Sequence, residues 1–196
     1  MADNRGEIAA KFGSLDILVN NAAFSLGRTA IMELEREQFA RVLDVNLIDS
    51  FQGMKAVIPH MTLAGRGAII NVASVNALRG ACFTGAYHAS KWGLRGLTKS
   101  ATVELATTGI RISTVLPGAI DTPMLNPNGR ATSEVVDAFR IGFGRTALSG
   151  EVAAATLLLA SDEASYVHGA ELTVDDGWSA GVYLGDMHAK PENREG

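Results

Sequence analysis

Two kinds of hydrophobic pattern alternate along the chain. Short, mainly apolar runs of the kind that form buried strands occur at 15–19, 68–72, 110–116 and 171–175. Apolar residues at helical spacing occur over 3–12, 35–64, 84–107 and 151–160. Helices that alternate with almost unbroken apolar strands are typical of a parallel sheet covered on both faces. The pattern therefore predicts an α/β fold with about four parallel strands.

Two stretches lack this regularity. Residues 119–149 are rich in Pro, Gly, Asn and Thr, so we expect an irregular excursion that contains a helix near 132–141. The residues from about 184 onward are polar. We therefore expect one domain over 1–183 and a polar tail over 184–196.

Composition and charge narrow the function classes. Hydrophobic residues make up 47% and charged residues 19% of the 196 positions, which is typical of a globular chain. The net charge of −4 and the lack of any Lys/Arg run argue against nucleic-acid binding. No apolar stretch reaches the roughly 20 residues that span a bilayer, so no membrane partner is expected. One cysteine, Cys82, and a start without a signal-peptide core predict a cytoplasmic protein.

Tyr87 and Lys91 are the first candidates for chemistry, because their spacing of four places them on one face of the predicted helix. A neighbouring ammonium favours the phenolate and lowers a phenol pKa that is ordinarily about 10. Such a tyrosine can exchange a proton with a substrate oxygen. A Tyr–Lys pair at this spacing also occurs on solvated helix surfaces. The pair alone is therefore compatible with a proton-transfer site and with an ordinary surface pair.

Ser74 lies just past the carboxyl end of the predicted strand 68–72, where parallel sheets place their ligands. Its hydroxyl could hold a substrate carbonyl, although a serine at this position is also an ordinary turn former or helix cap. The other reactive side chains have simpler interpretations. The four histidines lack metal-ligand spacing, and Cys82 is interpreted as a small apolar side chain near the pocket.

Several further motifs follow one another in the order found in the classical short-chain dehydrogenase/reductases, and the chain resembles this family. They are N-N-A-A at 20–23, Asn46 within D-V-N-L, Ser74 thirteen residues before Tyr87, Y-H-A-S-K at 87–91, Pro117-Gly118 with Thr122 four residues on, and V-D-D-G at 174–177. Ala23 and Asp176 depart from the family's pattern, where glycines stand. The resemblance covers residues 8–180 and implies a Rossmann-like, doubly wound parallel sheet.

The resemblance also implies a catalytic set without a metal. Tyr87 would be the general acid/base, and Lys91 would lower the Tyr87 pKa and bind the nicotinamide ribose. Ser74 would position the substrate carbonyl and stabilise charge on its oxygen. Asn46 would hold a water that relays protons towards Lys91.

The implied cofactor is NAD or NADP. Its contacts would come from Asn20, Ala22, Tyr87, Lys91, Pro117, Gly118, Ile120 and Thr122. Among these residues, Asn20 would mainly tie its strand to the neighbouring strands. Ala22 would line the cofactor groove, and Thr122 would contact the carboxamide.

One motif of the family is missing. Family members begin with a strand and the turn T-G-x-x-x-G-x-G, which lets the backbone approach the pyrophosphate, and no such motif occurs in the 196 residues. By resemblance, the chain is truncated at its N-terminus and lacks roughly 70 residues that carry three strands. We therefore expect the strand 15–19 to be an exposed edge and the adenosine half of the cofactor site to be absent, which makes cofactor binding doubtful. A misplaced start codon or gene fragment and a genuinely short protein both fit this pattern.

The function that the resemblance implies is NAD(P)-dependent interconversion of a secondary alcohol and a ketone, with a hydroxysteroid-like or 3-oxoacyl-like substrate. Met124, Phe139 and Phe143 in the variable stretch 123–149 suit a small apolar substrate. The family also implies a homo-oligomer formed through helices 35–64 and 84–107. Two alternatives are a non-catalytic oligomerisation fragment and a cofactor-independent dehalogenase. Lys91 argues against the dehalogenase, which has an arginine there.

Overall fold

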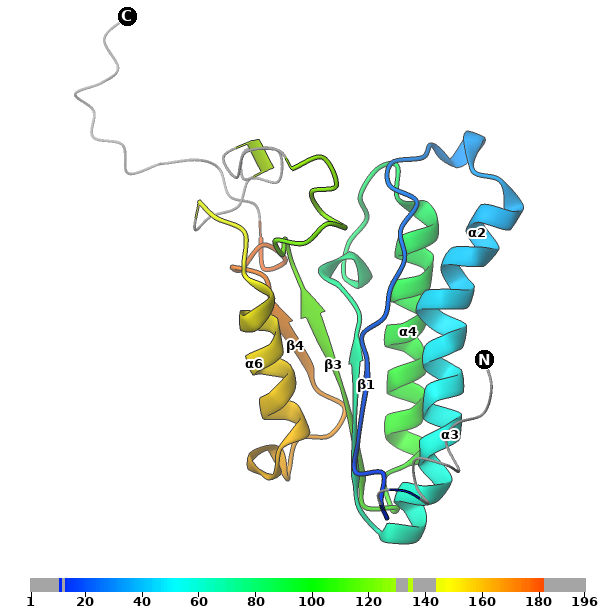
Figure 1. The fold of residues 1–196 in the computed structure, drawn as a ribbon, viewed down its shortest axis with the longest axis vertical. Coiled ribbons are helices and arrows are strands. Elements are labelled where there is room, and N and C mark those ends of the chain that lie inside the picture. The colour runs from blue at the N-terminus through cyan, green and yellow to red at the C-terminus, as the bar shows by residue number, and fades with distance from the viewer. Residues whose placement is uncertain (1–10, 12, 130–133, 136–143, 182–196) are drawn as a thin grey trace, which may run out of the picture.

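A four-stranded parallel sheet forms the centre of the computed structural model, which describes residues 11, 13–129, 134–135 and 144–181 (Figure 1). The strands are β1 (Ile17–Asn20), β2 (Gly67–Val72), β3 (Ile110–Pro117) and β4 (Glu171–Val174). They lie in the order β1-β2-β3-β4, and each neighbouring pair is parallel. The predicted α/β fold with a parallel sheet of four strands is confirmed.

Helices cover both faces of this sheet. One face carries α3 (Asp49–Ala64) and α4 (Gly85–Glu104), and α2 (Arg36–Leu43) packs beside α4 (Figure 1). The other face carries α6 (Ser149–Ala160). Short helical turns lie at Ile31–Glu33, Val75–Ala77 and Asp162–Ala164. The sheet is therefore wound on both sides, as the sequence predicts.

The strands are almost continuously apolar because successive side chains enter two different cores. Ile69 of β2 points towards α3 and α4 and packs with Met61. Ile70 points the other way and packs with Val115 and with Leu159 of α6. All five side chains are almost completely buried.

The predicted helix 35–64 is interrupted in the middle. It begins after Glu35 in a capping box with Gln38 and ends at Gly65, whose φ of 66° lies in the left-handed region that glycine favours. Between α2 and α3, the residues Asp44–Ile48 form a π-helical turn. Such a turn inserts an extra residue and is frequent at functional sites. Here it lies around Asn46, which is completely buried.

β1 is one of the two edge strands of the sheet in the described part of the chain, as expected. Its Leu18 packs on the core beneath α3. Ile17 and Val19 point to the opposite face, where α6 packs mainly on the other three strands. Ile17 is 54% exposed and Val19 is 42% exposed. The edge therefore presents both open backbone groups and apolar side chains.

Some expectations fall outside the described residues. These are most of the helices at 3–12 and 132–141, Phe139, Phe143, and the tail 184–196 with its domain boundary. Met124 is described, and it lies 46% exposed in the loop after β3. No helix in the described ranges is long and apolar enough to cross a membrane.

Candidate active site

The loops that follow the four strands meet at the carboxyl edge of the sheet, because parallel strands all end on the same side. Ser74 follows β2 and caps the helical turn Val75–Ala77 by accepting a hydrogen bond from the Asn76 N–H at 3.1 Å. Tyr87 and Lys91 lie in the first turns of α4. The structure thus brings the three predicted residues to one edge.

Lys91 is buried beneath Tyr87. Only 1% of its side-chain surface is exposed, and its ammonium donates a hydrogen bond to the Val72 carbonyl at 2.9 Å. The same ammonium lies 5.6 Å from the centroid of the Tyr87 ring. The Tyr87–Lys91 pair is therefore an interior contact at the end of β2, and the interpretation as a solvated surface pair is wrong.

Burial dominates the electrostatics of this pair. It raises the pKa of Tyr87, and a hydrogen bond with the Ser74 side chain opposes this shift. Burial also lowers the pKa of Lys91 to about 8. The net direction of the Tyr87 shift is upward, and the expected lowering of this pKa by Lys91 stays a prediction. Tyr87 is held as a neutral phenol, which is the form that donates a proton.

Asn46 joins three segments of the site through its side chain. Its amide nitrogen donates to the Phe24 carbonyl at 3.0 Å and to the Ser90 hydroxyl at 2.9 Å, and its amide oxygen accepts from the Phe24 N–H at 2.7 Å. Ser90 in turn donates to the Tyr87 carbonyl at 2.7 Å. The backbone carbonyl of Asn46 accepts from the Ser50 hydroxyl at 3.1 Å. Asn46 thus connects the loop after β1 to the first turn of α4.

Asn20 ties β1 to β2, as expected. Its amide nitrogen donates to the Asn71 side chain at 2.8 Å and to the Ser50 carbonyl at 3.2 Å. Asn71 is completely buried and donates to the Thr98 hydroxyl of α4 at 2.8 Å. The two strands and α4 therefore share one polar network within an otherwise apolar layer.

The other predicted cofactor residues border the same edge. Pro117 ends β3, and a Cβ on Gly118 would lie 2.8 Å from the Asp175 Cα, so only glycine fits there. Ile120 pairs with Ala147 through an isolated β-bridge. Thr122 donates to the Ile120 carbonyl at 3.3 Å. Ala22 is exposed in the loop after β1.

The donor set of Lys91 fits a nicotinamide ribose. An ammonium has three N–H donors, and Val72 accepts one of them. The other two form no further hydrogen bond within the described residues, although the group is almost fully buried. Hydroxyl oxygens of a ribose would satisfy them. The pyrophosphate end has no matching turn anywhere in the sequence.

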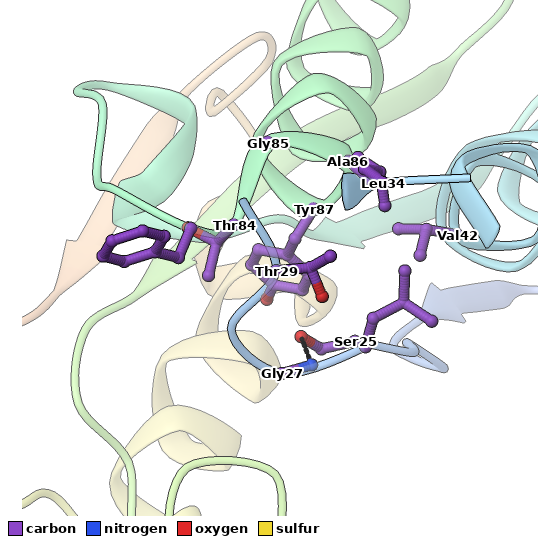
Figure 2. A pocket seen from close by; sticks show the side chains of 11 residues that line it. Ser25, Gly27, Thr29, Leu34, Val42, Thr84, Gly85, Ala86 and Tyr87 are labelled. Carbon is purple, nitrogen blue, oxygen red and sulfur yellow. Dashed lines mark hydrogen bonds between the residues drawn. The ribbon is translucent and has the colours of Figure 1, made fainter. Parts of the chain in front are cut away.

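A hollow borders Tyr87 on the side of the loop after β1 (Figure 2). Its walls come from two loops and the start of α4, and they include Ser25, Gly27, Thr29, Phe83, Thr84 and Tyr87. The Thr29 N–H donates to the Phe83 carbonyl at 2.7 Å, which joins the loops. Leu34 and Val42 add apolar surface. The hollow lies next to the candidate proton donor and offers both hydroxyl and apolar contacts.

The turn after β4 explains the departure from the family's V-D-G-G. Asp176 has a φ of 58°, a left-handed conformation that glycine adopts freely and aspartate tolerates. The Asp175 carboxylate accepts hydrogen bonds from the Gly177 and Ser179 N–H groups at 3.1 and 2.8 Å. The two aspartates therefore form a turn. No group of His, Cys, Asp or Glu side chains suited to a metal occurs within the described residues.

Sequence reasoning missed two residues of this network. Ser90 lies inside Y-H-A-S-K, but nothing in that motif indicates that its hydroxyl contacts Asn46. Asn71 had a visible signal, because it is the one polar residue in an apolar strand. A buried amide within a strand needs hydrogen-bond partners, and these are commonly on the adjoining elements.

Comparisons with known proteins bear on the family of this chain. A family profile described as enoyl-(acyl carrier protein) reductase matches residues 2–179. The chain is 42% identical over 180 residues to a 3-alpha-(or 20-beta)-hydroxysteroid dehydrogenase of Mycobacterium tuberculosis (strain ATCC 25618 / H37Rv). It is 39% identical over 179 residues to a trans-4-hydroxycyclohexanecarboxylate dehydrogenase of Sinomonas cyclohexanicum. Both matches cover 91% of this chain and 66% of the relative, so the chain spans just under two thirds of their length.

A solved structure extends the comparison to three dimensions. The gluconate 5-dehydrogenase of Burkholderia cenocepacia J2315, in complex with NADP and tartrate, superposes with a TM-score of 0.85 at 31% identity. The match covers 91% of this chain and 70% of that chain. The profile, the relatives and the solved structure agree with one another, and they show that this chain belongs to the short-chain dehydrogenase/reductase family.

Proposed function

We propose that the protein is an NAD(P)-dependent oxidoreductase that interconverts a secondary alcohol and a ketone, with Tyr87 as general acid/base. The observation that carries the proposal is the grouping of Tyr87, Lys91 and Ser74 at the carboxyl edge of the sheet. A partly buried phenol above a buried ammonium, beside a serine hydroxyl, supports proton transfer to a bound oxygen.

Tyr87 would supply the proton in ketone reduction. Its raised pKa keeps the phenol protonated at neutral pH, so the resting side chain is ready to donate to a carbonyl oxygen that gains negative charge. Ser74 would hydrogen-bond the same oxygen and orient it. In alcohol oxidation Tyr87 must first be ionised, so we expect oxidation, but not reduction, to accelerate as the pH rises from neutral towards the Tyr87 pKa.

Lys91 would hold the nicotinamide ribose with the N–H donors that Val72 leaves available. A bound nicotinamide supplies hydride in reduction and accepts it in oxidation. The ammonium charge of Lys91 would favour the phenolate of Tyr87 during oxidation. Asn46 would hold the water of a proton relay with its backbone carbonyl, which also accepts from the Ser50 hydroxyl, because both amide hydrogens already bind Phe24 and Ser90.

The names of the relatives support interconversion of an alcohol and a ketone, and they suggest two kinds of substrate. One is named for hydroxysteroids and another for trans-4-hydroxycyclohexanecarboxylate, and the solved structure holds NADP and tartrate. Leu34 and Val42 beside Tyr87 suit the apolar body of a small secondary alcohol.

Two measurements on the purified chain test the proposal. Isothermal titration with NADH and with NADPH measures cofactor binding, and absorbance at the nicotinamide band measures turnover of cyclohexanone and of a 3-oxosteroid. We expect binding of one nucleotide and ketone-dependent oxidation of it. Absence of binding to either nucleotide would favour the alternative of a non-catalytic oligomerisation protein.

We also propose that the chain forms a homo-oligomer through α3 and α4. Phe51 on α3 is 39% exposed, and Trp92 and Val103 on α4 are 46% and 79% exposed. Apolar side chains that are open in the single chain on two neighbouring helices are typical of a subunit interface. Sedimentation of Trp92→Glu against wild type tests this, with a lighter species expected for the variant.

A further inference from the structure

The hollow beside Tyr87 is built from uncharged side chains, but a cation stands at its rim. Gly27 and Thr29 both line the hollow, and Arg28 lies between them. No acidic or basic residue is among the lining residues. Arg28 is therefore the nearest charge to the hollow in that loop.

Contacts hold the Arg28 side chain across the gap between the two loops. Its guanidinium lies 4.9 Å from the centroid of the Phe83 ring, and its Nη2 lies 4.0 Å from the Cys82 sulfur. Phe83 forms the opposite wall, and its backbone has a φ of 66°, which is rare for a bulky residue. The hydrogen bond from Thr29 to the Phe83 carbonyl maintains that conformation.

Arg28 forms no salt bridge within the described part of the chain. The salt bridges of the described residues join other cations, namely Arg66, Arg95, Lys99 and Arg145. A stacked guanidinium is weakly hydrated and presents its N–H groups in one plane, which suits two-point binding of a carboxylate. An arginine that is oriented but not neutralised, beside a neutral hollow, is therefore suited to receive an anion.

We propose that Arg28 binds a carboxylate of the substrate, so that the compound converted at Tyr87 is a hydroxy acid or the matching oxo acid. This inference rests on the proposed function. The substrate's apolar body would lie against the open side of the hollow, its carbinol or carbonyl oxygen would meet Tyr87, and its carboxylate would meet Arg28 at the rim. A single guanidinium without a second cation favours a monovalent carboxylate over a phosphate.

The test compares an acid with a neutral ketone of the same ring. Binding of 4-oxocyclohexanecarboxylate and of cyclohexanone is measured by ligand-observed NMR, and turnover of each is measured with reduced nicotinamide cofactor. The proteins are wild type, Arg28→Met, Arg28→Lys, and the control Arg66→Met, which changes an exposed arginine at the opposite edge of the sheet. Each protein is measured at low and at high salt.

For Arg28→Met we expect affinity for the acid to fall roughly 10- to 100-fold, with cyclohexanone unaffected. Arg28→Lys should retain part of the affinity, and high salt should weaken acid binding in every one of these proteins except Arg28→Met. Equal acid binding by wild type and Arg28→Met, or no acid binding by wild type, would overturn the proposal. If no ketone is turned over, the proposed function fails, while the binding comparison still decides the role of Arg28.

Discussion

The carboxamide of Asn46 donates a hydrogen bond to the hydroxyl of Ser90 at 2.9 Å, across the contact between the π-helical turn and α4. The Ser90 hydroxyl in turn donates a hydrogen bond to the Tyr87 carbonyl at 2.7 Å. The Asn46 side chain also accepts a hydrogen bond from the Phe24 N–H and donates one to the Phe24 carbonyl. The loop after β1 and the turn that carries Tyr87 are thus joined by two side chains that are completely buried. In this arrangement Ser90 is a positioning residue for Tyr87.

Ser90→Ala should lower turnover about tenfold, because it releases the Tyr87 turn and leaves one Asn46 donor unsatisfied. Kinetics of the variant should show the loss in kcat, with little change in KM. Thr102→Val is the matched control, since Thr102 also donates to a carbonyl of α4 but lies away from the site. The double variant Asn46→Ala/Ser90→Ala should be no slower than Asn46→Ala alone. Additive losses in kcat would contradict the coupling.

Tyr87→Phe removes the hydroxyl that exchanges the substrate proton. We expect turnover to fall by roughly 100- to 10,000-fold, the range for loss of a general acid/base. Cofactor affinity should change little, since Lys91 keeps its ammonium beside Val72. Steady-state kinetics and titration calorimetry measure the two effects. Tyr166→Phe is the control, because that side chain is fully exposed, and retained turnover in Tyr87→Phe would remove Tyr87 from the proposed role.

The sequence predicts the sheet well because the strands and helices carry clear hydrophobic periods. Ile69 and Ile70 are neighbours in the sequence, and each is buried in the core on a different face of the sheet. This is why the sequence of β2 is a nearly continuous apolar run. The position of Ser74 beyond that run predicts its place at the carboxyl edge. These features depend on local pattern and on the general geometry of parallel sheets.

Other features depend on contacts that no local pattern contains. The π-helical turn within 35–64 lies where Asn46 bonds to Phe24 and Ser90, which are 22 and 44 residues away in the sequence. The Tyr87 pKa could not be assigned from the spacing to Lys91, because its direction depends on how deeply both groups are buried. The proposed role of Arg28 in anion binding could not be predicted from the sequence, because it depends on the contact with the loop that carries Phe83.

Asn71→Leu tests the polar network beneath the sheet edge. Leucine fills the same space but cannot bond to Asn20 or Thr98, so we expect the free energy of unfolding to fall by about 1–3 kcal/mol. Urea denaturation measures the change. Ile112→Val is a control for altered packing in the same layer and should cost about 1 kcal/mol. Equal stability of Asn71→Leu and wild type would show that the network adds nothing to the fold.

The last prediction concerns the burial of Lys91. The folded pKa of about 8 lies below the ordinary value of 10.5, so the unfolded chain binds more protons between these two pH values. Stability must therefore rise with pH across that window, by about 2–4 kcal/mol for this group. Below pH 8 the ammonium is charged in both states, and the full cost of burying it is present.

Lys91→Met lacks this group, so its stability relative to wild type should be greatest near pH 7 and should decline as the pH rises to 10. Urea denaturation of both proteins at pH 7, 8.5 and 10 measures the difference. Tyr87 is retained in both proteins, so its opposing contribution above pH 10 largely cancels. Lys99→Met, which removes a lysine 55% exposed on the same helix, controls for the loss of a positive charge. A stability difference that stays constant with pH would mean that the Lys91 ammonium is not destabilised by burial.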